Sequence, residues 1–339
     1  MNAHSPASCA TCGNADCRLS FVSRDIAPVA ERTAFVLDEM WPELRDHVVR
    51  MARADDQVLF PGWFGRTLPR YGWGGGRTAG GLATARRHLV MRQVARAAGA
   101  VRQPAYIEAD RRLAAALAGR IDYRARHIVV SQTLLPWLWR DGVLGGRSFD
   151  VLMTRYPLRD LQMRLDAVAM RYPQSPTIAD FRAPQALVAD EAEALAAARR
   201  LVTPHHHIAE SFGERAVWLD WHRPAVRPRR AGEGVAFLGP AIARQGAYEV
   251  RDMAAGLKTP LIVFGADLEG GDFWGDMNVE RRTMGPGWLD DIGVLLHPAA
   301  VTHAPRRLIE AAAQGVTIYA DPTCGLAPGQ FQPLLAFRP

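Results

Sequence analysis

A glycine and an arginine follow an apolar run in the second half of the chain, in an order that suits phosphate binding. Residues 235–238 form the apolar run, Gly239 follows it directly, and Arg244 comes shortly afterwards. Glycine at the end of a parallel strand lets backbone N–H groups approach a phosphate closely. A guanidinium adds a permanent, forked charge that matches a diphosphate. The same strand–glycine–helix turn also occurs in α/β proteins generally, so the pattern alone leaves a purely structural role open.

A second group of polar residues follows the apolar run 293–297. Thr302 and His303 lie in the expected loop, and Glu310 lies on the expected helix, because Pro305 favours a first helical turn. A carboxylate can accept two hydrogen bonds from sugar hydroxyls, and an imidazole can donate to a sugar or a phosphate. The alternatives are a solvent-facing helix residue for Glu310 and a structural loop residue for His303.

This second segment resembles the donor domain of GT-B glycosyltransferases of the retaining family 4, also called group 1. Members carry a strand, Pro-Ser, a Glu, seven residues, a second Glu and a helix of small residues ending in Gly-Val-Pro-Val. Pro298 and Glu310 match this pattern, and residues 311–316 match the end of the helix. The Glu-x7-Glu motif is degraded, because Thr302 stands at the first Glu. Gln245 likewise stands where the phosphate-binding Lys is usual.

The resemblance implies an α/β protein with a GT-B-like fold, in which two Rossmann-like domains face each other across a cleft. It also covers residues 237–246 and extends loosely back to residue 127. It implies a glycosyltransferase that moves a sugar from a nucleotide-diphosphate sugar to an acceptor, with no cofactor required. The implied donor-binding residues are Gly239, Arg244, Thr302, His303 and Glu310, with Glu310 on the ribose. The catalytic residues, the sugar and the acceptor stay open.

Two further residues are candidates for contact with a sugar or acceptor. Trp73 lies in the glycine-rich stretch 72–76, where a flexible backbone and an exposed ring would suit a binding loop. His205 is the first of three adjacent histidines. Adjacent side chains point in different directions, so the three do not form a metal site by themselves. The alternative for His205 is a loop that caps a helix.

Three cysteines near the N-terminus have part of the spacing of a metal site. Cys9, Cys12 and Cys17 give a C-x2-C pair and a third thiolate, with His4 as a candidate fourth ligand. A closed tetrahedral zinc site needs about four ligands. Two hypotheses therefore stand: a zinc or iron–sulfur site that a protein partner could complete, or a tail of unpaired reduced thiols.

The order of apolar runs predicts two α/β domains. From residue 127 onward, runs of strand length alternate with stretches of helical periodicity, which is typical of βαβ units and a parallel sheet. The Arg- and Pro-rich segment 223–233 cannot continue a helix or a central strand and is predicted to be a linker. We therefore expect a flexible tail at 1–17, an N-terminal Rossmann-like acceptor domain at 18–222 and a C-terminal Rossmann-like donor domain at 234–339.

The same pattern predicts the individual elements. The expected strands are 57–60, 127–131, 150–154, 177–180, 200–203, 216–220, 235–239, 261–265, 293–297 and 316–320. The expected helices are 26–53, 82–98, 158–171, 190–199, 247–256, 287–291 and 305–314.

Composition sets the outer limits. The chain has 339 residues and a formal net charge of +6, with basic residues dispersed rather than clustered, so no nucleic-acid partner is expected. The first residues contain no apolar signal region, and no run approaches the roughly 18 apolar residues of a membrane helix. We expect a cytoplasmic protein, with peripheral membrane contact as an alternative.

A competing hypothesis is a GT-B-like binding or assembly protein that has lost transfer activity. Thr302 and Gln245 at motif positions favour it, as does the cysteine tail, which could attach the chain to a partner. A nucleotide-sugar epimerase on the same fold is disfavoured, because the chain lacks a matching set of carboxylates.

Overall fold

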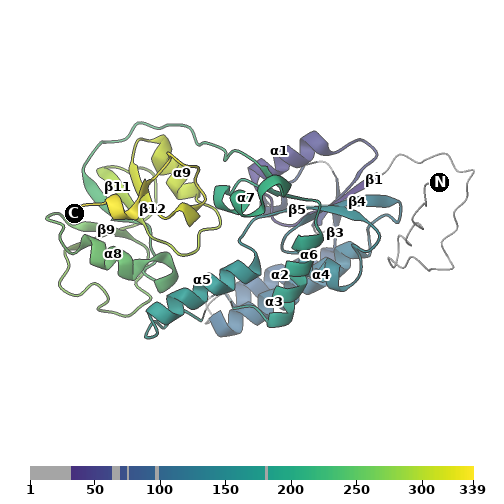
Figure 1. Cartoon of the computed structure of the whole chain (residues 1–339), viewed down its shortest axis with the longest axis horizontal. Helices are drawn as coiled ribbons and strands as arrows, with labels where there is room; N and C mark the ends of the chain where they lie inside the picture. Colours follow the sequence, from purple (N-terminus) through teal and green to yellow (C-terminus); the bar gives the residue numbers. More distant parts are fainter. Residues whose placement is uncertain (1–31, 63–68, 75, 96–98, 180–181) are drawn as a thin grey trace, which may run out of the picture. The chain divides into compact units, whose positions relative to one another are not determined.

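The computed structural model describes residues 32–62, 69–74, 76–95, 99–179 and 182–339. The chain divides into two compact units, each built on one parallel sheet (Figure 1). Unit 1 contains the described residues up to 158 together with 182–203 and 212–219. Unit 2 contains 159–179, 204–211 and 220–339. These two sheets confirm the predicted pair of Rossmann-like α/β domains.

Among the described residues, the sheet of unit 1 has seven parallel strands in the order β3-β2-β1-β4-β5-β6-β7. From β1 the order runs outward to β3, and from β4 it runs the opposite way to β7. The carboxyl ends of β1 and β4 therefore lie at a switch point, the place where ligands bind in open α/β sheets. The strands are β1 (Arg32–Val36), β2 (Gln57–Pro61), β3 (Arg77–Ala79), β4 (Ala125–Ser131), β5 (Ser148–Leu152), β6 (Arg200–Thr203) and β7 (Ala216–Trp218).

Helices connect the strands of unit 1 and cover its sheet. On one face, Leu44 and Val48 of α1 pack with Phe35 and Val129 of the two central strands in one apolar cluster. Short apolar strands buried in this way are typical of parallel sheets. The helices are α1 (Pro42–Met51), α2 (Gly81–Gln93), α3 (Gly99–Ala118), α4 (Leu135–Arg140) and α6 (Gln185–Ala197), with 3-10 turns η1 (Pro69–Tyr71) and η2 (Gly213–Arg215).

The described part of unit 2 contains six parallel strands in the order β10-β9-β8-β11-β12-β13. Its switch point lies between β8 and β11. The four strands that the sequence predicts in this half, at 235–239, 261–265, 293–297 and 316–320, are confirmed as parallel members of one sheet. The strands are β8 (Gly234–Phe237), β9 (Leu261–Phe264), β10 (Val279–Arg282), β11 (Ile292–His297), β12 (Thr317–Ala320) and β13 (Gln332–Pro333).

Side chains of β8 alternate between two apolar layers of unit 2. Phe237 packs in the same cluster as Tyr248 of α8, whereas Ala236 packs in the cluster of Leu308 from α9. The two helices accordingly cover opposite faces of the sheet (Figure 1). The helices are α5 (Leu158–Arg171), α7 (His206–Phe212), α8 (Ala247–Ala254) and α9 (Arg306–Ala313), with 3-10 turns η3 (Ala243–Gln245), η4 (Pro322–Cys324) and η5 (Leu334–Ala336).

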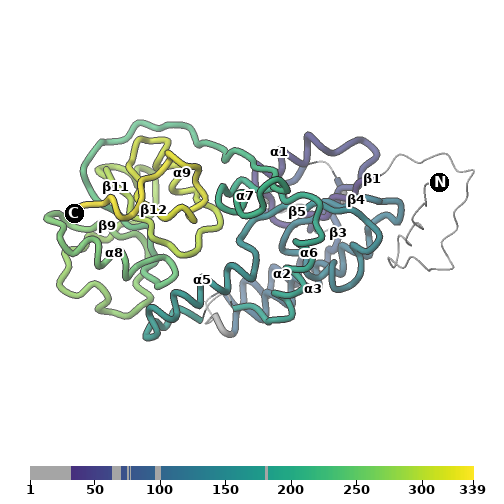
Figure 2. The backbone as a smooth tube through the Cα atoms, viewed as in Figure 1, coloured from purple at the N-terminus to yellow at the C-terminus, as the bar shows by residue number. Residues whose placement is uncertain are grey.

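Two segments from the first half of the chain fold with unit 2, as the backbone trace in Figure 2 lets the reader follow. In the first, residues 159–179, Tyr172 stacks on Tyr248 with ring centroids 4.3 Å apart, and Arg171 forms an ion pair with Glu249 at 3.2 Å. In the second, residues 204–211, the His206 N–H donates to the Gly325 carbonyl at 3.2 Å. Residues 159–179 and 204–211, which lie within the expected N-terminal domain 18–222, therefore fold with unit 2.

Three predicted elements are wrong. The expected helix 26–53 contains β1 and then α1, because the buried apolar residues 34–36 belong to a strand and Pro42 starts a new helix. Residues 177–179 form a turn instead of a strand, and 287–291 form a turn that begins with a left-handed Gly287. The edge strand β10 was missed because its sequence carries charge at three of its four positions.

In the part of the chain that the structure describes, no helix has the length and apolar character needed to cross a membrane.

Gly239 is required by close packing at the end of β8. A Cβ at this position would lie 2.1 Å from the carbonyl oxygen of Phe264, whereas a Cβ at Gly271 would meet no atom within 4 Å. We expect Gly239→Ala to lower the free energy of unfolding by about 1–3 kcal/mol, the usual cost of overpacking. Urea denaturation measures this, with Gly271→Ala as the matched control. Equal midpoints for the two variants would contradict the packing argument.

Candidate functional site

The loops that follow β8 and β11 contact each other at the switch point of unit 2. Gly246 is left-handed, with φ of 79°, and a Cβ there would lie 2.5 Å from the Pro298 carbonyl oxygen. The Ala300 N–H donates to the Arg244 carbonyl at 3.0 Å. The structure therefore brings the loop of Gly239 and Arg244 next to the loop of Thr302 and His303.

Backbone groups that follow Gly239 are hydrogen-bonded to the neighbouring loop. The Ala241 N–H donates to the Ala266 carbonyl at 2.9 Å, and the Leu268 N–H donates to the Ala241 carbonyl at 3.1 Å. The loop after β8 thus continues the pairing with the segment after β9. The glycine at position 239 is explained by the approach of Phe264, and its role toward phosphate stays a prediction.

The carboxylate of Glu269 collects donors at the start of η3. Oε1 accepts the Ala243 N–H at 2.7 Å and the Ser175 hydroxyl at 2.9 Å, and it also accepts the Thr177 hydroxyl. Oε2 accepts the Tyr248 hydroxyl at 2.9 Å. Glu269 therefore ties α8, η3 and the segment after α5 together within unit 2. Glu269 also occupies the backbone N–H of Ala243, which an anionic ligand would otherwise use.

Two histidines hold the loop after β11 through Thr302. Nε2 of His205 lies 2.9 Å from the Thr302 carbonyl oxygen, and Nε2 of His297 lies 2.8 Å from the Thr302 hydroxyl. A carbonyl only accepts, so Nε2 of His205 carries the proton, while its Nδ1 accepts the Ile208 N–H at 3.3 Å. This pattern needs neutral imidazole. The Thr302 hydroxyl therefore has a partner inside the unit.

Burial strongly favours the neutral form of both rings. Burial lowers the pKa of His205 to about 4, although the hydrogen bond to Thr302 acts in the opposite direction. Burial alone lowers the pKa of His297 to about 4. His205 is 1% exposed, so the interpretation as a structural residue fits this structure, and contact of its ring with a sugar would require the ring to be uncovered.

Helix α9 begins with positive charge where the helix dipole is also positive. Its N-cap residue, Pro305, offers no side-chain hydrogen bond, and its first turn contains Arg306 and Arg307 but no acidic residue. The Arg306 guanidinium lies over the Trp221 ring at 4.8 Å. A helix N-terminus with added guanidinium groups favours an anion such as phosphate.

Glu310 lies apart from the other predicted donor residues. Its Oε2 accepts from Arg307 at 2.7 Å, and it lines a pocket of about 380 Å³. Among the described residues that line this pocket, none is Gly239, Arg244, Thr302 or His303. Four of the five predicted residues therefore lie on two contacting loops, and Glu310 opens onto a different surface. The lining residues are Arg227, Pro228, Arg229, Met284, Gly285, Pro286, Gly287, Trp288, Leu289, Asp290, Arg307, Glu310 and Gln314.

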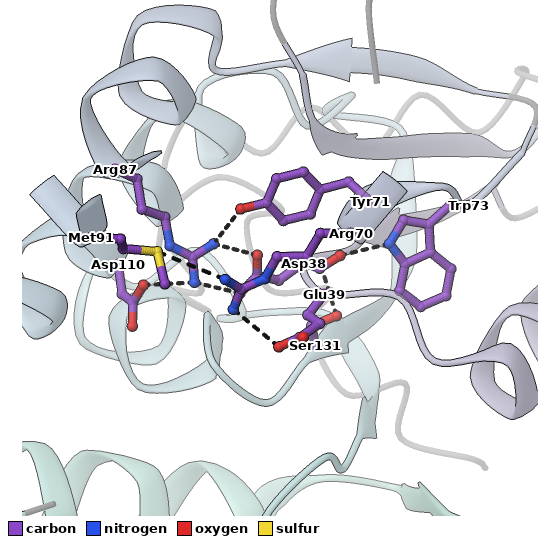
Figure 3. Close-up of polar contacts among 9 residues, drawn as sticks. All are labelled: Asp38, Glu39, Arg70, Tyr71, Trp73, Arg87, Met91, Asp110 and Ser131. Atoms are coloured by element: carbon purple, nitrogen blue, oxygen red, sulfur yellow. Dashed lines mark hydrogen bonds and ion pairs between the residues drawn. The ribbon is translucent and has the colours of Figure 1, made fainter. Parts of the chain in front are cut away.

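The expectation of an exposed ring at Trp73 is wrong. The side chain is 2% exposed, and its Nε1–H donates to the Asp38 carbonyl at 2.6 Å (Figure 3). The flanking glycines let the chain turn around the buried ring. Trp73 therefore fixes the segment that follows β1, rather than presenting an aromatic face to a ligand.

A charged cluster that the sequence did not reveal lies at the switch point of unit 1. Figure 3 shows the Asp38 carboxylate against Arg87, with distances of 2.5 Å from Oδ1 to Nη1 and 2.9 Å from Oδ2 to Nη2. Arg87 also contacts Asp110 at 2.8 Å and the Tyr71 hydroxyl at 3.2 Å. The Asp38 N–H donates to the Ser131 hydroxyl at 2.9 Å, which joins the loops after β1 and β4.

A second buried network lies after β4 and β5. Glu191 is 1% exposed and accepts from Arg155 Nη2 at 2.7 Å, from Gln132 and from the Leu158 N–H. Burial raises the pKa of Glu191, and the charge of Arg155 opposes that effect. The position of Asp38 directly after a buried run was a usable sequence signal. No local pattern marked Arg87 or Glu191 as its partners.

The predicted cysteine site lies outside the described residues. Cys9, Cys12 and Cys17 all precede residue 32, so both hypotheses for the tail stay predictions. Within the described residues, no group of three or more His, Cys, Asp and Glu side chains is arranged to hold a metal ion. Cys324 is buried, and burial raises the pKa of its thiol to about 11, which makes it a poor nucleophile.

No protein-family model matches the chain, and no curated protein matches it. Solved structures give looser likenesses. Arabidopsis thaliana UGT89C1 complexed with UDP is 12% identical with a TM-score of 0.43, over 86% of this chain and 80% of that chain. LpCGTa in complex with UDP is 12% identical with a TM-score of 0.40, over the same shares. CalG4, the calicheamicin glycosyltransferase, is 14% identical with a TM-score of 0.39, over 87% and 80%. We therefore take the fold from the chain's own two sheets, and the function from its own residues.

The buried histidines predict a loss of stability in acid. Because the pKa of His205 is lower in the folded protein than the ordinary 6.5, its stabilising effect is complete above pH 6.5 and disappears as pH falls toward 4. The contribution at stake is about 3 kcal/mol for a shift of this size.

Urea unfolding at pH 8, 6 and 4.5 tests this. We expect His205→Gln to be less stable than the wild type at pH 8 and to lose less stability on acidification. The exposed His88, changed to Gln, is the control. A pH dependence of His205→Gln equal to that of the wild type would show that His205 does not carry the effect.

Proposed function

We propose that the chain is a GT-B glycosyltransferase that transfers a sugar from a nucleotide-diphosphate sugar to an acceptor. The observation that carries the proposal is the start of α9 in unit 2, where the helix dipole and Arg306 favour an anion, while the neighbouring Arg307 is paired with Glu310. This helix start follows the loop that contacts Arg244 at a switch point, where ligands of parallel sheets bind.

In this proposal, unit 2 binds the diphosphate by positive charge without a metal ion. Arginine and helix N-terminal N–H groups can stabilise the charge that develops on a leaving diphosphate. The resemblance to the retaining family 4 is the finer part of the proposal. It depends on Pro298 and Glu310, since Thr302 replaces the first Glu of the motif. We therefore leave the anomeric configuration of the product to experiment.

The second candidate function is a sugar-nucleotide-binding protein without transfer activity. Two observations favour it: Thr302 is hydrogen-bonded to His297, and Glu269 occupies the Ala243 N–H near the expected phosphate loop. Binding without release of nucleoside diphosphate would support this candidate over the glycosyltransferase.

Calorimetry with UDP-, GDP- and TDP-linked sugars tests the proposal. We expect at least one to bind. We expect Arg244→Ala and Arg306→Gln each to weaken it about tenfold to a hundredfold, the scale for charged hydrogen bonds. Arg338→Ala, an exposed arginine elsewhere in unit 2, is the control. No binding by the wild type, or an equal loss with Arg338→Ala, would contradict the assignment of the donor site.

Glu310 provides a separate test of the family resemblance. If its carboxylate holds the ribose, Glu310→Gln should weaken binding by about 1–3 kcal/mol. The structure pairs this carboxylate with Arg307, so Arg307→Gln is the matched variant that releases Glu310 without removing it. Unchanged affinity for Glu310→Gln in calorimetry would leave Glu310 as a helix residue and limit the donor site to the two contacting loops.

A further inference from the structure

The excess positive charge of the chain falls in one segment of the sequence. Of the 41 basic residues, eight arginines lie in residues 57–107, which contain neither Asp nor Glu. The other 33 basic residues are matched by 35 acidic residues in the rest of the chain. The formal net charge is therefore +8 for this segment and −2 for everything else. A segment of one sign attracts a partner of the opposite sign.

Helix α2 lies within this segment and has two faces of different character. Arg87 is buried, and Figure 3 shows its guanidinium pointing into the charged cluster against Asp38. The opposite face exposes Leu82 by 84% and Leu89 by 55%. A helix has 3.6 residues per turn, so Arg86 shares this outer face with the two leucines. The outer face of α2 therefore presents apolar side chains and positive charge together.

Two arginines flank the leucines on the outer face of α2. Arg86 follows Leu82 by four residues, and Arg92 follows Leu89 by three, so each arginine stands one turn from a leucine. Both arginines are exposed, and among the described residues no carboxylate pairs with either of them. Helix α2 has no acidic residue of its own, and Glu108, the next one along the chain, pairs with arginines of α3. The charge of the outer face is therefore left for a partner.

The combination of exposed leucines and unpaired arginines identifies the kind of partner. Leucine side chains gain free energy by entering the boundary between lipid headgroups and acyl chains, and guanidinium groups are attracted to lipid phosphates. A nucleic acid would match the charge of the arginines but would leave the two leucines in water. An anionic lipid surface satisfies both features of the same helix face.

We propose that α2 is a docking helix for an anionic membrane surface. Leu82 and Leu89 enter the headgroup boundary, and Arg86 and Arg92 contact lipid phosphates on either side of them. The helix lies along the surface and does not span the bilayer, so the attachment is reversible and depends on salt. This inference does not depend on the proposed function, because it uses only the outer face of α2.

Co-sedimentation of the full chain with lipid vesicles tests the proposal. We expect binding to vesicles of equal parts phosphatidylglycerol and phosphatidylcholine, much weaker binding to phosphatidylcholine alone, and loss of binding as salt is raised. Arg86→Gln combined with Arg92→Gln should weaken binding about 10- to 30-fold, because each basic residue near an anionic surface contributes about fivefold. Leu82→Ser and Leu89→Ser should each weaken it about five- to tenfold, from the apolar area left in water.

Matched controls come from exposed residues outside the segment 57–107. Arg126 is exposed on β4, and Leu335 is 88% exposed on η5. We expect Arg126→Gln and Leu335→Ser to bind vesicles as the wild type does. Because the four tested side chains of α2 are exposed or only lightly packed, every variant should keep the thermal melting of the wild type, which circular dichroism measures.

Three results would overturn the proposal. The first is equal binding of the wild type to charged and uncharged vesicles, or binding to neither. The second is an equal loss of binding in the control variants. The third is binding of a duplex DNA oligonucleotide that the arginine variant loses, together with vesicle binding that the leucine variants keep. That third result would assign the outer face of α2 to a soluble polyanion.

Discussion

A carboxylate buried beside the end of a parallel strand must be matched by donors, and this requirement shapes the carboxyl edge of both sheets. In unit 1, Asp38 is matched by Arg87 from α2. In unit 2, Glu269 is matched by donors from η3, α8 and the segment after α5. The donors come from segments that are distant in the sequence. Each carboxylate therefore fixes, within its own unit, the loops that frame the switch point.

The same requirement decides which groups remain for a ligand. Backbone pairing with the neighbouring loop and the Glu269 carboxylate engage the N–H groups of Ala241 and Ala243 after β8, and the role of Gly239 toward phosphate stays a prediction. The start of α9 has its helix dipole and Arg306, whereas Arg307 is paired with Glu310 one turn further along the helix. The helix start after β11 is therefore a place in unit 2 that favours an anion.

How much the sequence could predict follows from the range of the interactions involved. The buried strands β8, β9, β11 and β12 were predictable because each is a short apolar run bounded by turn residues. The path of residues 159–179 into unit 2 was not, because it depends on the stacking of Tyr172 on Tyr248 and on donors to Glu269. The prediction of an exposed ring at Trp73 was wrong for the same reason. The flanking glycines suggest a flexible loop, but the ring donates to the Asp38 carbonyl and packs in an apolar cluster.

Within each unit, the partners of a charged group decide what that group can do. In unit 2, Arg306 and the helix start of α9 are suited to stabilise negative charge, whereas Arg307 is paired with Glu310. In unit 1, Asp38 and Asp110 share the single guanidinium of Arg87, and burial raises the pKa of Asp110 to about 6. Because the buried Arg87 binds both oxygens of Asp38, it only partly neutralises Asp110.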